Sequence, residues 1–121
     1  MKRDIELIRK VVLQIESMPT GYVFEKLSVD GYSDEQIGYH CYLIADAGLA
    51  KGLDQTAIDA KSPYWHILHL TSAGHDFADA VRNDSTWKKA TGIVKEKAGG
   101  ATVEILKEVL TRVVKDTLGL P

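Results

Sequence analysis

The chain opens with a segment in which hydrophobic residues recur at spacings of three and four. This pattern covers Asp4 to Met18 and predicts an amphipathic helix with one buried face. Pro19 and Gly21 should end the helix, because the residue before a proline avoids helical backbone angles and glycine favours a turn. The apolar positions that define the buried face are Ile5, Ile8, Val12 and Ile15, with Leu7 and Val11 beside them.

The pattern changes between Tyr22 and Val29, where β-branched and aromatic residues favour a short strand. A turn follows at Asp30–Tyr32. Ser33 then opens a second helix, because its hydroxyl can accept the backbone N–H of Gln36 while the Gln36 side chain reaches back, which is a capping box. We expect this central helix to end at Gly48 and to bury Ile37, His40, Cys41, Ile44 and Ala47.

A β-hairpin is predicted after Gly48. Its first strand begins at Leu49 and reaches Leu53, its polar tip covers Asp54 to Pro63, and its aromatic return strand covers Tyr64 to Thr71. Thr71 or Ser72 caps a further helix that runs to the region of Asn83.

The composition changes after Asn83, and we place a domain boundary there. Residues 84–121 then form a C-terminal helical extension, packed on the domain of residues 1–83 or used for dimerisation. Helices are predicted at Asp84–Ala98 and Ala101–Leu118. The last helix carries an apolar face that must be buried against the same chain or a second copy. We predict homodimerisation through Val103, Leu106, Leu110 and Val113.

Length and composition fit one small globular domain with an appended element. The chain has 121 residues, 45% of them hydrophobic, and a formal net charge of -2. Cys41 is the only cysteine, which excludes an intramolecular disulfide and fits a reducing compartment. The first residues lack the apolar run of a signal peptide, and no stretch is apolar enough for a membrane span. We therefore expect a cytoplasmic protein of a bacterium, or of a cell infected by a phage.

Two runs of residues resemble known patterns. Gly31-Tyr32-Ser33 with Ile37, His40, Leu43 and Ala47-Gly48-Leu49 resembles the GLS…V..HL..L..AGL pattern of winged-helix repressors, whose corresponding helix enters the DNA major groove. The run from His69 to Phe77 is similar to the LT..G..F strand-to-helix junction of winged helices. From Met1 to about Leu110, the chain is similar to a small bacterial and phage family catalogued as domain of unknown function 2513.

This resemblance implies an α+β, winged-helix-like fold: a helix, a short strand, a central helix and a two-stranded wing, with the C-terminal helical extension behind them. It implies no established activity and transfers no site residues. A function must therefore be argued from the side chains themselves.

The charges of the central helix argue against DNA reading. From residue 30 to residue 46 there are four acidic residues and no lysine or arginine, whereas affinity for DNA depends largely on cations that neutralise phosphates. Tyrosine is common at the centres of protein interfaces, although one of the two tyrosines here could instead pack under the wing. The predicted interaction face is Asp34, Glu35, Gln36, Tyr39, Tyr42 and Asp46.

We therefore predict a small non-enzymatic protein that acts by binding or assembling with another, unidentified protein. The alternative is a DNA-binding transcriptional regulator of bacterial or phage origin. Its nucleic-acid backbone contacts would come from the basic stretch, which a solvated helix face also explains. The cations of that stretch are Arg82, Lys88, Lys89, Lys95 and Lys97.

The histidines and the cysteine do not form a ligand pattern. His40 and Cys41 are adjacent on a helix and diverge by about 100°, and His66 and His69 point to opposite faces of a strand. A composite site of Cys41 with a distant histidine stays open. The sequence also lacks a glycine-rich phosphate loop and a paired nucleophile, so we expect no enzyme, no cofactor, no metal and no membrane association.

Overall fold

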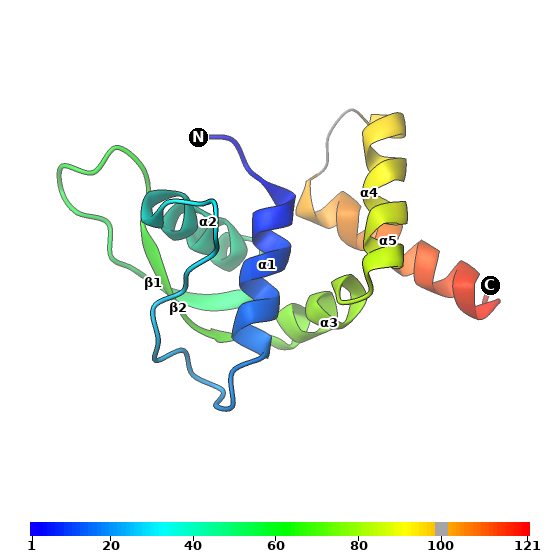
Figure 1. Cartoon of the computed structure of the whole chain (residues 1–121), viewed down its shortest axis with the longest axis horizontal. Coiled ribbons are helices and arrows are strands. Elements are labelled where there is room, and N and C mark those ends of the chain that lie inside the picture. The colour runs from blue at the N-terminus through cyan, green and yellow to red at the C-terminus, as the bar shows by residue number, and fades with distance from the viewer. Residues whose placement is uncertain (99–101) are drawn as a thin grey trace. The chain divides into compact units, whose positions relative to one another are not determined.

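A computed structural model of the chain describes the backbone of residues 1–98 and 102–121 and the side chains of residues 1–95 and 102–121. These residues form an α+β structure of helices and one antiparallel hairpin (Figure 1). None of the described helices combines the length and apolar character that a membrane span requires. The elements are α1 (Ile5–Glu16), α2 (Asp34–Asp46), β1 (Ala50–Asp54), β2 (Trp65–Leu70), α3 (Ser72–Val81), α4 (Asp84–Ala98) and α5 (Val103–Leu118).

The chain divides into two compact units, Met1–His75 and Asp76–Pro121, and the boundary along the chain falls within α3. The domain boundary expected after residue 83 stays a prediction, because units defined by contacts need not fold independently.

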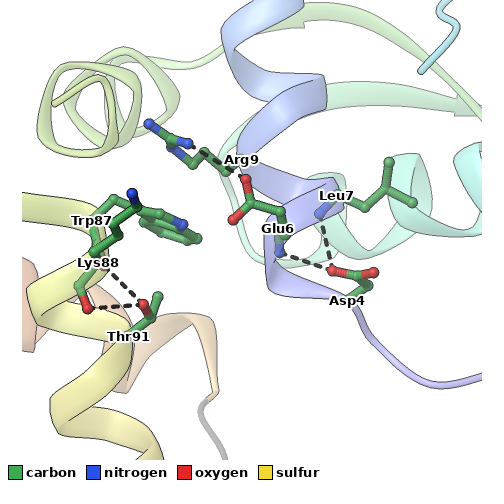
Figure 2. A network of polar contacts seen from close by, with 7 residues as sticks. All are labelled: Asp4, Glu6, Leu7, Arg9, Trp87, Lys88 and Thr91. Atoms are coloured by element: carbon green, nitrogen blue, oxygen red, sulfur yellow. Dashed lines mark hydrogen bonds and ion pairs between the residues drawn. The ribbon is translucent and has the colours of Figure 1, made fainter. Parts of the chain in front are cut away.

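Helix α1 begins where its sequence provides a cap. One carboxylate oxygen of Asp4 accepts the backbone N–H groups of Glu6 at 2.9 Å and Leu7 at 3.1 Å (Figure 2). These bonds satisfy donors that the first helical turn leaves without partners. The helix packs on α2 and β2. Its buried residues are Leu7, Ile8, Val11, Val12 and Ile15, as the spacing predicts, whereas Ile5 from the same predicted face is only half-buried.

The strand predicted at residues 22–29 is wrong. This segment is an extended but irregular chain, and a backbone hydrogen bond from Val23 N–H to Leu68 O at 2.9 Å joins it to the sheet. A side chain takes the place of a neighbouring strand at Ser28: the Gln14 amide donates to Ser28 O at 2.9 Å and accepts Ser28 N–H at 3.2 Å. The segment is anchored by its buried residues Val23 and Leu27.

Helix α2 begins and ends as predicted. Ser33 Oγ accepts Gln36 N–H at 3.1 Å, and Gln36 Oε1 accepts Ser33 N–H at 2.8 Å, so the capping box is complete. At the other end Gly48 has a φ of 80°, a left-handed conformation that glycine adopts without a Cβ penalty. The N–H of Leu49 then donates to Ile44 O at 3.1 Å, which closes a Schellman motif.

The hairpin is also confirmed, with its strand ends shifted by about one residue. β1 pairs antiparallel with β2, with an irregularity in register between Lys51 and Gly52. At the base of the long tip, Gln55 N–H donates to Tyr64 O at 3.0 Å. Both strands pack on α2, and together with α1 they enclose the core of the first unit.

The second unit is built on the packing of α4 against α5. Within α4 the Thr91 hydroxyl bonds back to the carbonyl oxygens of Trp87 and Lys88 (Figure 2). The four residues assigned to dimerisation are buried in the single chain, since Val103 is 8% exposed and Leu106, Leu110 and Val113 are 2% exposed or less. Packing within the chain thus buries the apolar face that suggested a dimer. Homodimerisation stays a prediction.

Candidate interaction surface on α2 and the wing

The outer face of α2 carries a stripe of residues at spacings of four, three and four, which places them above one another on one side of a helix. Its ends, Glu35 and Asp46, are exposed, and its two central tyrosines are half-buried. Asp34 lies exposed beside the stripe, and Gln36 is half-buried there because its side chain serves the cap. The stripe consists of Glu35, Tyr39, Tyr42 and Asp46.

The aromatic rings of the stripe continue onto the hairpin. The ring centroids of Tyr39 and Tyr42 are 5.9 Å apart, and those of Tyr42 and Trp65 are 5.6 Å apart in a tilted arrangement. Trp65 begins β2. Tyr42 is therefore the one of the two tyrosines that packs against the hairpin. Trp65 is absent from the predicted interaction face. Its only signal was an aromatic residue at the start of a strand predicted to pack on the central helix.

Acidic groups dominate the charge around the first turn of α2. Lys26 Nζ lies 2.6 Å from Asp34 Oδ2, and this hydrogen bond raises the pKa of the lysine. Lys26 thus offsets the charge of Asp34, and the charge of Glu35 remains. The Glu35 carboxylate accepts a long hydrogen bond of 3.4 Å from Ser62 Oγ in the hairpin tip. Asp54, at the end of β1, has a lowered pKa because the Thr56 hydroxyl and backbone N–H stabilise its ionised form.

A buried histidine holds α2 against the start of α1. His40 is 1% exposed; its Nε2 accepts the backbone N–H of Asp4 at 2.8 Å, and its Nδ1 lies 2.7 Å from Gln36 O. These partners require a neutral ring with the proton on Nδ1. The Tyr32 hydroxyl donates to the second Asp4 oxygen at 2.8 Å. His40 is therefore the core-facing histidine that its spacing predicts, and it positions the helix.

A groove of about 280 Å³ runs along α2 on the side away from the tyrosine stripe. Its lining comes from α2, from the hairpin and from the irregular segment after Val23. At its rim the Phe24 side chain is 80% exposed. Tyr64 closes over Gly38, where an added Cβ would overlap the tyrosine ring. The main apolar lining residues are Phe24, Leu27, Ile37, Tyr64, Trp65 and Ile67.

Cys41 lies in the wall of the same groove but is 2% exposed. Burial raises the pKa of its thiol to about 12, so the thiolate that would bind a metal is disfavoured at neutral pH. In the part of the chain that the structure describes, no three histidine, cysteine, aspartate or glutamate side chains gather closely enough to hold a metal ion.

The predicted basic contacts lie in the second unit and at its start. Lys88, Lys89 and Lys95 are exposed on α4. Arg82 forms an ion pair with Asp79 at 3.0 Å, which offsets its charge locally. The Lys97 side chain lies outside the described residues. Three lysines on one helix make a small cationic patch, and this geometry is compatible with a solvated face as well as with phosphate contacts.

Comparison with known proteins places the chain in a family. The family model described as hypothetical protein DUF2513 matches residues 2–101. The chain belongs to this family. An uncharacterized protein of Haemophilus influenzae (strain KW20 / Rd) is 28% identical over 126 residues, covering 98% of this chain and 99% of that protein. No solved structure matches the DUF2513 chain.

Proposed function

We propose that this DUF2513 protein acts by binding another protein through the outer face of α2 and the adjoining wing of a winged-helix-like domain. The observation that carries the proposal is the stripe of Glu35, Tyr39, Tyr42 and Asp46, continued by Trp65. Aromatic side chains with polar tips anchor protein interfaces. The winged-helix assignment is supported by the order of α1, the capped α2 and the hairpin.

The same face is poorly suited to duplex DNA. Phosphates would meet carboxylates along α2, which carries no lysine or arginine from residue 34 to residue 46. The nearby Lys26 is held 2.6 Å from Asp34. Since neutralisation of phosphates supplies most non-specific affinity for DNA, docking through α2 would begin with repulsion. The alternative of a DNA-binding regulator finds its support in Lys88, Lys89 and Lys95 on α4.

The test is affinity capture from the native host with the full chain as bait, with and without nuclease, followed by mass spectrometry. We expect a protein that survives nuclease treatment and is lost with the Tyr39→Ala bait. The matched control is Tyr22→Ala, which removes a tyrosine that is 61% exposed on another segment. Tight, sequence-specific binding of duplex DNA at near-physiological salt, with no protein retained, would refute the proposal.

A further inference from the structure

The groove beside α2 has the size and lining of a site for a side chain. Its volume of about 280 Å³ falls just below the range of roughly 300–1,000 Å³ that small-molecule sites occupy. Leu27, Ile37 and Ile67 line it with apolar groups. The space therefore suits one or two apolar side chains of a polypeptide better than a whole cofactor.

The groove exists because the chain after Val23 leaves the sheet. Val23 is bonded to β2 through Leu68, whereas the next four residues line the wall opposite Trp65, His66 and Ile67. This departure also leaves Phe24 80% exposed. An exposed phenylalanine at the mouth of an apolar groove is a ready contact for an inserted side chain, because aromatic residues contribute strongly to interface energy.

Charge around the groove selects the partner. Glu25 and Lys26 lie in its lining, and Lys26 is matched by Asp34. The carboxylate of Glu25 is therefore the surplus charge of the lining. An incoming segment with lysine or arginine beside its apolar residue would be complementary, whereas an acidic segment would be repelled.

We propose that this groove, which we call the α2 groove, binds a segment of another protein in which an apolar side chain is flanked by lysine or arginine. The apolar side chain enters beside Phe24 and lies over Leu27, Ile37 and Ile67, which are each 7% exposed or less. The basic flank meets Glu25. This inference rests on the proposed function, because it names a second contact site, which shares Trp65 with the first, for the same class of partner and gives that partner's chemistry.

The experiment is selection of peptides from a random short-peptide library on the immobilised full chain, followed by methyl NMR with the enriched peptides. We expect apolar residues flanked by lysine or arginine among the selected peptides. Their binding should shift the methyl resonances of Leu27, Ile37 and Ile67. No enrichment, or enrichment of neutral or acidic peptides, overturns the inference.

Variants separate the α2 groove from the tyrosine stripe. Glu25→Lys should weaken a selected basic peptide at least about tenfold, and Phe24→Ala should weaken it about tenfold, the equivalent of one rim anchor. The matched control, Glu104→Lys on α5, makes the same charge change and should alter affinity less than about twofold. Peptides that instead shift the backbone amide resonances of Tyr39 and Asp46, recorded on the same complexes, would sink this inference and leave the proposed function standing.

Discussion

The hydrogen bonds of Asp4 allow a quantitative prediction for the variant Asp4→Ala. The carboxylate accepts two backbone N–H groups at the start of α1, at 2.9 and 3.1 Å, and the Tyr32 hydroxyl at 2.8 Å. Loss of an N-cap costs about 1 kcal/mol, and loss of the acceptor for a half-buried hydroxyl costs about 1 kcal/mol more. The bond from the Asp4 backbone N–H to His40 survives in alanine. We therefore expect the variant to lose about 2 kcal/mol of unfolding free energy.

The assay is urea unfolding followed by the indole N–H resonance of Trp65, which reports on the first unit. At about 2 kcal/mol per molar urea, the midpoint should fall by about 1 M. Tyr32→Phe is the matched control and should lose about 1 kcal/mol. The double variant should lose little more than Asp4→Ala, because the hydroxyl acts through the carboxylate. A loss below about 0.5 kcal/mol for Asp4→Ala would refute the reasoning.

The pH dependence of the same variant gives a second readout. Burial alone raises the pKa of the Asp4 carboxyl, but hydrogen bonds from Tyr32, Leu7 and Glu6 outweigh burial and lower it. A lowered pKa in the folded state means that the stabilisation is complete above the unfolded value of about 3.9 and is lost as pH falls through the folded value. The difference between native protein and Asp4→Ala should therefore shrink below about pH 4 and stay constant near neutrality.

Three further predictions concern packing and the buried thiol. Gly74→Ala should cost about 1–3 kcal/mol, because the new Cβ would overlap the backbone carbonyl oxygen of Leu49, which cannot move aside as a side chain would; an unchanged urea midpoint would contradict it. Leu106→Ala should lower the unfolding free energy of the second unit by about 2–5 kcal/mol, because Leu106 is 1% exposed. The native indole resonance of Trp87 should then disappear at a lower urea concentration. Cys41, with a thiol pKa raised to about 12, should resist an aromatic disulfide reagent at pH 8 in the native protein and react promptly in denaturant; fast native reaction would disprove the burial.

Local signals in the sequence were enough to predict most of the elements. Ser33 and Gln36 lie three apart and cap each other, and Gly48 supplies the left-handed residue that ends α2. Both features depend on neighbours along the chain, so one sequence contains all the information they need. The hairpin followed for the same reason, from an aromatic return strand and a polar tip.

Contacts between distant residues were not predictable in this way. The segment at residues 22–29 has strand-forming residues. The backbone N–H and carbonyl of Ser28, however, form hydrogen bonds with the Gln14 amide of α1 instead of with a neighbouring strand. The pairing of Tyr42 with Trp65 likewise joins residues from different elements. For α5 the spacing correctly marked a buried face, but periodicity alone cannot tell whether a helix of the same chain or a second copy covers it.

The closeness of Gly38 to Tyr64 has a consequence for how the family can vary. A side chain at position 38 would enter the space that the tyrosine ring fills. The two positions, 26 residues apart, should therefore change together among relatives: where position 38 is larger than glycine, we expect a residue smaller than tyrosine at position 64. Such covariation would show, from sequences alone, that the base of the hairpin packs closely on α2.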